Sequence, residues 1–272
     1  MRRAPHDRDL QYGGQTLEAA SAFWTRWARH REDEVRARTG ARDAFAFARL
    51  AFRLPRLEVR LSETEAGRRI RANLGARVLG FLPKHRLAQG VLAVPPTLGE
   101  YLTGRSRRAV RTNVAHAARK GIATDLLVTV DARRDALNRN AGPAPAPVDR
   151  DWREVWSLRA AEDGRVWLAA SDAEGGFWGL AVATVDVEWA MIEVAIAREH
   201  AVRWQLHTAM LAHFVDTGVQ YVFTADGNAL SVGPSLRHVQ RLLGYSVANL
   251  VVGRAAPTRR CAPAAAVADP SS

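Results

Sequence analysis

The sequence predicts an α+β fold: a mixed, mostly antiparallel sheet flanked by helices, with an N-terminal α/β accessory layer. The prediction depends on residues 165–245, where two apolar runs enclose the segment SDAEGG at 171–176. Its Ser, Asp and Gly residues suit a turn that joins two antiparallel strands. Patterns typical of a strand, a helix, a second strand and a second helix then follow. The resulting order, β-β-β-α-β-α, indicates one sheet with helices packed against it.

Each element of this stretch has its own signal. The expected strands are the apolar runs at 166–170, 177–183, 189–197 and 219–223. The expected helices are 201–217 and 235–243. Gly218 and Gly244 follow these helices, at the position where a left-handed residue commonly ends a helix.

The residues before this stretch give weaker patterns. A helical stripe covers 16–38, residues 57–61 alternate as a half-buried strand does, and 70–74 indicates another short strand. We therefore expect an accessory subdomain in this part of the chain. The predicted division is disorder at 1–15, the accessory subdomain at 16–90, the main domain at 91–252 with a Pro-rich linker at 141–148, and a disordered tail at 253–272.

The composition indicates a cytoplasmic protein without a membrane span. The single cysteine, Cys261, permits no internal disulfide, and the charged N-terminus leads into no apolar signal region. No apolar run approaches the roughly 20 residues that a membrane helix needs. His200, His207 and His213 lack the spacing of a zinc site, so we expect no metal.

A helix that is apolar on one face and basic on another is predicted at 106–120. A short helix capped by Thr97 precedes it, with Glu100 at the capping-box spacing. The formal net charge of the chain is +11, and its basic residues are nearly all Arg. The net charge of a whole chain bears on solubility and non-specific association, so the local charge of this helix is the more informative observation about binding. Its candidate anion-binding residues are Arg107, Arg108 and Arg111. A solvated amphipathic helix is the alternative interpretation.

Several segments together resemble a known family. They read YLTGRSRRAVRTNVAHAARKGI, GRVWLAASDAEGGFWGLAVATV, WAMIEVAIA, AVRWQLHTAMLAHFVDTGVQYVFTAD and LRHVQRLLGYSV. In this order they resemble the Fem-type branch of the GNAT-like acyltransferases, over about residues 91–252. The resemblance implies transfer of an acetyl or aminoacyl group to a small-molecule amine. It implies acyl-CoA (acetyl-CoA) or an aminoacyl-tRNA as the donor.

The donor site departs from the GNAT pattern in one respect. GNAT proteins that bind acetyl-CoA have a glycine-containing turn after the central strand, whose backbone N–H groups hold the pyrophosphate. The corresponding turn here, REHAVR at 198–203, contains no glycine, and Glu199 would repel a phosphate. Fem-type relatives also lack the glycine turn. The candidate donor-binding residues are Ile196, Ala197, Arg198, Arg203 and Ser231. Ser231 precedes the last predicted helix, whose free N–H groups could bind an anion; a capping serine beside a proline is the alternative interpretation.

Glu193 is the leading candidate for a catalytic base. Strict alternation places it on one face of its strand with Ala195, and places Ile192 on the other face. A carboxylate in a central strand must be paired or hydrogen-bonded, and desolvation would raise its pKa towards the range that a base acting on an amine needs. The alternative is a structural carboxylate paired to an arginine such as Arg159 or Arg203.

Tyr245 and Asp226 complete the catalytic candidates. Tyr245 follows the last predicted helix, where GNAT proteins often place an acid for the leaving thiolate; the alternative is a packing residue. Asp226 closes a predicted strand, and residues at strand ends often line the site of an open sheet. Its alternative role is a turn residue that bonds its own backbone.

Two hypotheses about function remain. The first is N-acyl transfer from a CoA thioester or aminoacyl-tRNA to an amine. The second is a catalytically inactive GNAT-like module that binds RNA or another anionic partner through the basic helix at 105–120.

Overall fold

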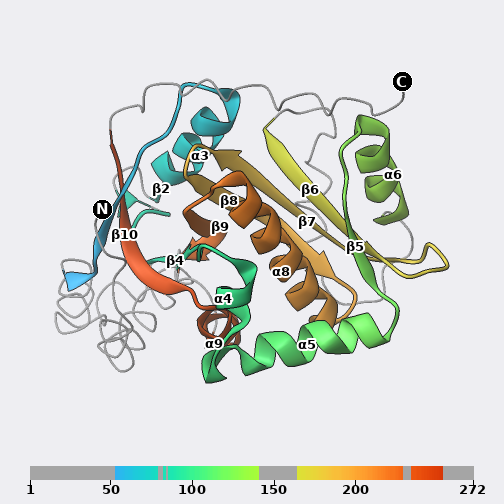
Figure 1. Ribbon diagram of the computed structural model, residues 1–272. Helices are drawn as coiled ribbons and strands as arrows, with labels where there is room; N and C mark the ends of the chain where they lie inside the picture. Colours follow the sequence, from blue (N-terminus) through green and yellow to red (C-terminus); the bar gives the residue numbers. More distant parts are fainter. Residues whose placement is uncertain (1–52, 79–81, 84, 141–163, 229–233, 254–272) are drawn as a thin grey trace, which may run out of the picture.

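The structure is a computed structural model that describes residues 53–78, 82–83, 85–140, 164–228 and 234–253 (Figure 1). The predicted segments at 1–15 and 16–38, the linker at 141–148, Ser231 and the tail from 254 onward lie outside the described residues. The predicted boundary at 90/91 falls within a strand, Gln89–Ala93, which belongs to the main sheet.

An eight-stranded sheet forms the centre of the molecule. The strands of the described part are β1 Arg56–Val59, β2 Arg77–Val78, β3 Leu82–Pro83, β4 Gln89–Ala93, β5 Ala123–Leu126, β6 Arg165–Ser171, β7 Phe177–Asp186, β8 Trp189–Ala197, β9 Tyr221–Asn228 and β10 Ser246–Val252. Their order in the sheet is β1-β10-β4-β9-β8-β7-β6-β5, and β2 pairs with β3 separately. β1 with β10 and β8 with β9 are parallel, and the other pairs of the large sheet are antiparallel. The predicted mixed, mostly antiparallel sheet is therefore confirmed.

Helices cover both faces of this sheet. They are α3 Glu65–Gly75, α4 Leu98–Leu102, the 3-10 turn η2 Arg105–Arg107, α5 Arg108–Arg119, α6 Val130–Asn140, α8 His200–Thr217 and α9 Pro234–Leu243. One face packs against α8, with α4, α5 and α9 around it, and its core contains Ala181, Ala183 and Leu206. The opposite face packs against α6, through Val182, and against α3, through Ile70.

The helix ends follow the expected local chemistry. Thr64 caps α3, because its hydroxyl accepts a hydrogen bond from the Gly67 backbone N–H. Gly218 adopts the left-handed conformation after α8, with φ 76°, and Gly244 has φ 90° after α9. The helices predicted at 201–217 and 235–243 are confirmed, each within one residue at both ends.

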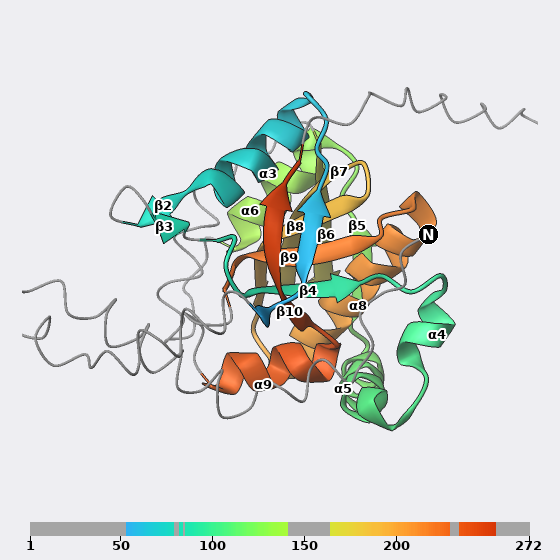
Figure 2. The same cartoon turned by 90° about the vertical axis from the view of Figure 1, so that its left-hand side faces the viewer.

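The early part of the chain joins the same sheet. The strand predicted at 57–61 is confirmed as β1, which runs beside β10 at the sheet edge (Figure 2). The strand predicted at 70–74 is wrong, because these residues form the second half of α3. Their apolar members, Ile70 and Leu74, are buried against the sheet at helical spacing.

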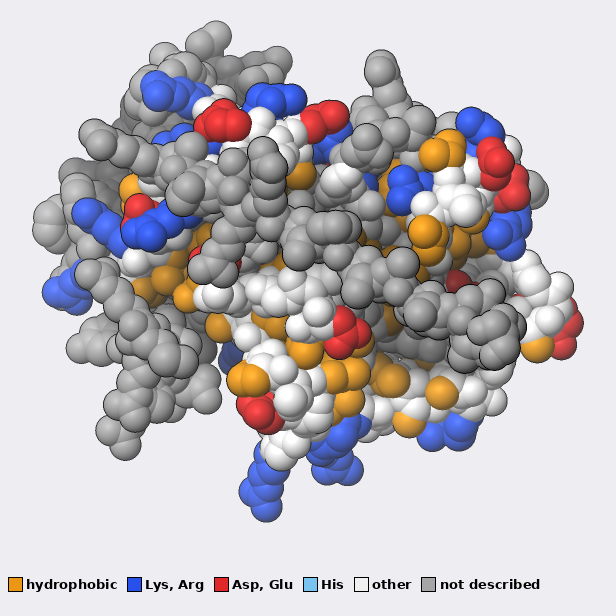
Figure 3. Space-filling view, turned by 45° about the horizontal axis from the view of Figure 1, so that its top comes forward, with side chains coloured by type: hydrophobic (Ala, Val, Ile, Leu, Met, Phe, Trp, Pro, Cys, Tyr) orange, Lys and Arg blue, Asp and Glu red, His pale blue; other side chains and the backbone are white. Residues whose placement is uncertain are grey.

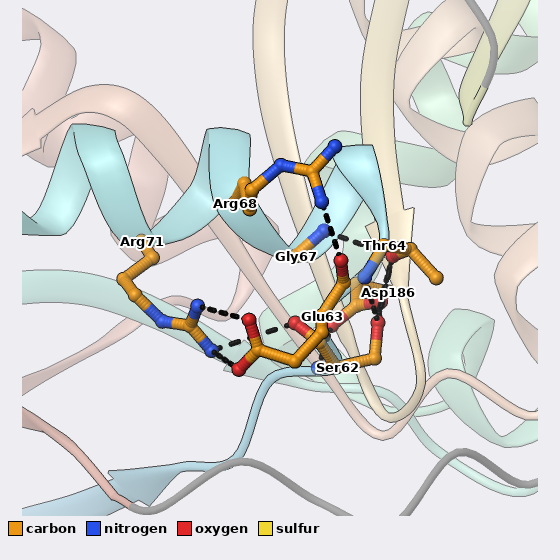
Figure 4. Close-up of polar contacts among 7 residues, drawn as sticks. All are labelled: Ser62, Glu63, Thr64, Gly67, Arg68, Arg71 and Asp186. Carbon is orange, nitrogen blue, oxygen red and sulfur yellow. Dashed lines mark hydrogen bonds and ion pairs between the residues drawn. The ribbon is translucent and has the colours of Figure 1, made fainter.

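A buried carboxylate attaches the start of α3 to the sheet (Figure 4). Asp186, at the end of β7, accepts hydrogen bonds from the Ser62 N–H at 2.7 Å and from the Ser62 hydroxyl at 2.5 Å. It also accepts one from the Thr64 hydroxyl at 3.0 Å. Gly67 is required here, since a Cβ at this position would lie 2.2 Å from the Ser62 carbonyl oxygen. This contact fixes how α3 crosses the sheet.

Candidate active site

A β-bulge at Glu193 marks the centre of the candidate site. Val194 pairs with Val182, whereas Ile192 pairs with Ala183, so Glu193 is an extra residue in β8. Beyond the bulge, each residue of β8 lies on the face of the sheet opposite to the one that strict alternation would give. Ile192 and Ala195 both pack on the α8 face, whereas Val194 packs on the α6 face. The prediction that Ile192 lies on the face opposite Ala195 is therefore wrong, because an extra residue changes the register of the pleat.

β8 and β9 separate just after this bulge. Their parallel pairing runs from Trp189↔Tyr221 to Ile192↔Thr224 and extends no further among the described residues. β8 nevertheless continues to Ala197 and β9 to Asn228. We call this region, residues 193–197 of β8 and 225–228 of β9, the strand divergence. A bulge bends its strand, which explains why the two strands separate at this point.

Helix α3 crosses the strand divergence on one face of the sheet. Nη1 of Arg69 lies 3.9 Å from Oε1 of Glu193 on β8. One helical turn later, Nδ2 of Asn73 donates to the Ala225 carbonyl on β9 at 3.5 Å. A single helix therefore contacts both strands where they separate.

Glu193 lies within a network of donors. Nε and Nη2 of Arg165 donate to its two carboxylate oxygens at 3.0 and 2.6 Å, and the Thr184 hydroxyl donates to Oε1. The side chains of Glu193 and Arg165 are 12% and 8% exposed. The arginine that pairs with Glu193 is thus Arg165, rather than the Arg159 or Arg203 considered from the sequence. The role of Glu193 as a base remains a prediction.

Tyr245 is buried beside a histidine of α8. Its hydroxyl lies 3.0 Å from Nε2 of His207, and the nearby Tyr101 hydroxyl donates to the Leu243 carbonyl at 3.0 Å. Burial raises the pKa of the Tyr245 hydroxyl, so this group stays protonated over the physiological range. Burial, with a smaller contribution from the positive charge of Arg107, lowers the pKa of His207 to about 3. The pair is therefore neutral and holds two protons.

This buried histidine predicts acid sensitivity. His207 is neutral in the folded chain down to about pH 3, whereas an unfolded histidine binds a proton below about pH 6.5. Unfolding therefore takes up a proton between these values, and stability falls as the pH is lowered through this range, by at most about 1.4 kcal/mol per pH unit. Urea unfolding at pH 7, 6, 5 and 4 measures this dependence. His207→Gln is expected to have a flatter dependence than the wild type; equal slopes would contradict the prediction.

The predicted donor-binding residues lie around the end of β8 and the start of α8. Ile196 is buried on the α6 face, and Ala197 is half-buried on the α8 face. The side chain of Arg198 is exposed and that of Arg203 is half-buried. Glu199 immediately precedes α8, and its carboxylate pairs with Lys120 at 2.6 Å. This pairing offsets the repulsion that Glu199 would exert on a phosphate.

Two further candidates are only partly described. Asp226 was predicted to close its strand, but its backbone lies inside β9, which continues to Asn228. Its side chain lies outside the described part, as does the whole of Ser231.

Two of the three candidate arginines of the basic helix make hydrogen bonds within the fold. Nη1 of Arg107 donates to the Leu242 carbonyl at 3.0 Å, and its guanidinium lies 5.2 Å from the centre of the Tyr101 ring. Nη1 of Arg111 donates to the Leu102 and Gly104 carbonyls at 2.5 and 2.9 Å. Arg108 is exposed. Basic side chains project from the lower edge of the molecule in Figure 3, the side on which α5 lies in Figure 1.

Two absences concern the described residues alone. They contain no group of three or more His, Cys, Asp or Glu side chains arranged to hold a metal ion. None of their helices combines the length and the apolar character needed to cross a membrane.

Similarity to known proteins is confined to solved structures. No protein-family model matches the chain, and no curated protein does. FemX matches with a TM-score of 0.43 and 8% identity, over 70% of this chain and 62% of that one. The C-terminal domain of a putative lysylphosphatidylglycerol synthetase from Agrobacterium fabrum matches at 0.42 and 14%, over 59% and 58%. A tandem GNAT protein from the clavulanic acid biosynthesis pathway matches at 0.37 and 16%, over 72% and 59%.

Two of these three matches, FemX and the tandem GNAT protein, carry the names of the classes that the sequence resembles. These matches concern the outline of the fold alone, at TM-scores of 0.37–0.43 and 8–16% identity. The chain spans about three fifths of the length of these three structures.

Several residues of the site were not found by sequence reasoning. Arg165, Thr184 and Arg69 surround Glu193, and His207 pairs with Tyr245. A signal existed for Thr184, a hydroxyl inside an otherwise apolar strand, and for Arg165, which directly precedes the first apolar run.

Proposed function

We propose that this chain is an N-acyltransferase that moves an acetyl or aminoacyl group from a CoA thioester or an aminoacyl-tRNA to an amine. The observation that supports the proposal is the strand divergence. Interior strands normally pair on both edges, because unpaired backbone N–H and C=O groups are costly. At 193–197, β8 has no strand neighbour on its β9 side among the described residues. An extended, amide-bearing donor could add to such an edge as a strand does.

The proposed reaction assigns roles to the candidate residues. The neutral amine attacks the acyl carbon, a C–N bond forms, and the C–S bond of a thioester or the C–O bond of an ester breaks. Glu193 takes the proton that the amine loses, and Tyr245 supplies a proton to the leaving group, with Asp226 as a further candidate. Ile196 and Ala197 would align the donor through their backbone, and Arg198, Arg203 and Ser231 would contact its phosphates.

Donor binding provides the direct test. Thermal unfolding is measured with acetyl-CoA, longer acyl-CoAs and aminoacyl-tRNA, with ATP as a nucleotide control that lacks the acyl arm. A ligand at 100 times its Kd stabilises the folded state by about 2.7 kcal/mol, so the melting temperature should rise by several degrees with the true donor. Equal shifts with ATP would indicate phosphate binding alone. If neither thioesters nor aminoacyl-tRNA raised the melting temperature, acyl transfer would be contradicted.

A second candidate function, binding of RNA or another anionic partner, is favoured by one specific observation. Residues 101–124 contain six Arg and Lys residues and no Asp or Glu. Arg105, Arg108 and Arg119 of this segment are exposed. Such a surface favours phosphate contacts through charge. Stabilisation by uncharged tRNA, lost in Arg105→Glu/Arg108→Glu and unaffected in Arg60→Glu, would support this function over acyl transfer.

A further inference from the structure

Two helices share a surface to which they contribute no acidic side chain. α5 and α9 lie side by side along the lower edge of the molecule in both Figure 1 and Figure 2. Nη1 of Arg107, in the turn η2 that precedes α5, donates to the Leu242 carbonyl of α9 at 3.0 Å and so attaches the two helices to each other. Neither residues 101–124 nor residues 234–253 contain Asp or Glu. We call their exposed arginines without inward hydrogen bonds, Arg105, Arg108, Arg119 and Arg241, the α5–α9 surface.

The arginines of the α5–α9 surface have no carboxylate partner within the described part of the chain. The polar contact of Arg241 there is with an imidazole, Nδ1 of His238 at 3.2 Å. Other exposed cations pair with nearby acids: Arg60 with Glu58, Lys120 with Glu199 and Arg134 with Asp131. An excess of arginine spread evenly over the chain would not explain why two segments that meet in the fold both lack acids. Like charges gathered in this way repel one another, and a bound polyanion would remove that repulsion.

The outermost stripe of α5 has a cation at each end and small side chains between them. It consists of Arg108, Thr112, Ala115 and Arg119, all exposed and spaced by four, three and four residues along the helix. The opposite side of α5 is buried, with Val110 at 0% exposure. At a rise of 1.5 Å per residue, the two arginines of the stripe are roughly 16 Å apart along the axis. They can therefore contact separate phosphates, and no bulky side chain between them keeps a nucleic acid away.

The surface lacks the side chains that single-stranded nucleic acids and bilayers bind. The large apolar side chains exposed in the described residues are Leu126, Val128, Val130, Val187 and Val251, none of which belongs to α5 or α9. Single strands are bound largely by stacking on aromatic rings, and interfacial helices insert Trp, Phe or Leu into the membrane. Double-stranded RNA is instead recognised through phosphates and 2′-hydroxyls across a wide, shallow minor groove. A helix with arginines at its ends and the Thr112 hydroxyl between them suits that groove.

We propose that the α5–α9 surface binds the sugar–phosphate backbone of double-stranded RNA without reading its sequence. Its four arginines contact phosphates, and the Thr112 hydroxyl contacts a 2′-hydroxyl. Every nucleotide of RNA carries these groups, so the contacts give affinity rather than sequence preference. This inference rests on the second candidate function, the binding of an anionic partner. It specifies that partner and extends the binding surface from the basic helix to α9.

The test measures binding of the full chain to a fluorescent RNA duplex of about 16 base pairs, by anisotropy at several salt concentrations. Four phosphate contacts predict a slope of about −3 to −4 for log K against log salt concentration, hence a loss of about a hundredfold in affinity between 50 and 200 mM salt. A DNA duplex of the same sequence lacks the 2′-hydroxyl and should bind about three- to tenfold more weakly, the effect of losing one net hydrogen bond. Thr112→Val should remove this difference.

Charge-matched variants identify the surface. Arg108→Gln/Arg119→Gln should reduce the steepness of the salt dependence by about 2, and Arg241→Gln should reduce it by about 1. The matched control is Arg60→Gln/Arg134→Gln, which removes the same charge from two ion-paired arginines whose side chains are 64% and 60% exposed. This control should leave the salt dependence of duplex binding unchanged. Because all the replaced side chains are exposed, none of the variants should lose its fold, and circular dichroism checks this.

Competing probes decide between partners. Single-stranded RNA of the same sequence and phosphatidylglycerol vesicles are tested under the same conditions, and either one binding as tightly as the duplex would overturn the proposal. Equal losses in the control and in Arg108→Gln/Arg119→Gln, or full binding by Arg241→Gln, would do the same. Binding of single strands alone leaves the second candidate function standing and removes this inference. If no RNA binds, both are removed, whereas acyl transfer is decided separately by the donor titration.

Discussion

Replacement of Arg165 by methionine is expected to lower the free energy of unfolding by about 3–5 kcal/mol, the usual cost of removing one partner of a buried ion pair. Arg165 is 8% exposed and binds both carboxylate oxygens of Glu193, which is 12% exposed. The variant would leave that carboxylate in the sheet with the Thr184 hydroxyl and the more distant guanidinium of Arg69. The loss should therefore far exceed that of a surface pair.

Urea unfolding of matched variants measures this effect. Arg60→Met removes an exposed ion pair with Glu58 and should leave the stability close to that of the wild type. The double variant Arg165→Met/Glu193→Met should regain most of the loss, because replacing both partners of a buried pair by apolar groups is often neutral. A single Arg165→Met variant as stable as Arg60→Met would show that the pair contributes little.

The same ion pair decides between the two roles of Glu193. Glu193→Gln keeps one acceptor oxygen for Arg165 but removes the charge that Arg165 faces, so the melting temperature should fall whichever role is correct. If Glu193 is the base, the folded variant has lost its activity, whereas if the carboxylate is purely structural, the folded variant keeps it. Measuring both quantities on one preparation separates the two roles.

The elements that the sequence predicted well are those set by local chemistry. The order β-β-β-α-β-α from 165 to 245 could be predicted from apolar periodicity. Gly218 ends α8 because the backbone there adopts the left-handed conformation, which glycine adopts readily. The strand predicted at 70–74 failed because a short apolar pattern fits both periods. The N-cap residue Thr64 indicates a helix rather than a strand, but it lies six residues before Ile70.

The candidate site is formed by contacts between strands, which no local sequence pattern encodes. Glu193 was recognisable as a carboxylate in an apolar strand. Its bulge was not, because a bulge is defined by the partners Val182 and Ala183 on β7. Its counter-ion, Arg165, pairs with Thr184 across the β6–β7 hairpin, but the register shifts between Ala170 and Ser171, so extending it from the turn at 171–176 would have placed Arg165 opposite Ala183. The contacts of Asn73 and Gln89 with β9 exist only because α3 and β4 lie beside that strand in the fold.

Replacement of Asp186 by alanine is expected to cost about 3 kcal/mol or more, because it removes three hydrogen bonds at a residue that is 5% exposed. The Ser62 N–H and hydroxyl and the Thr64 hydroxyl would lose their acceptor (Figure 4). Each buried polar group without a partner costs about 1–3 kcal/mol. The Thr64 hydroxyl also caps α3 through Gly67, so the start of the helix should loosen as well.

The consequence for the site separates this variant from a general loss of stability. Asp186 lies near the first turn of α3, and Arg69 and Asn73 follow on the same helix above the strand divergence. Amide hydrogen exchange should therefore rise in residues 65–75 of Asp186→Ala well before the exchange of α8 changes. The matched control is Glu63→Ala, whose carboxylate is 65% exposed and pairs with Arg71 on the surface. That variant should lose less than about 1 kcal/mol. Uniform exchange across α3 and α8 in Asp186→Ala would mean that α3 is not anchored independently by Asp186.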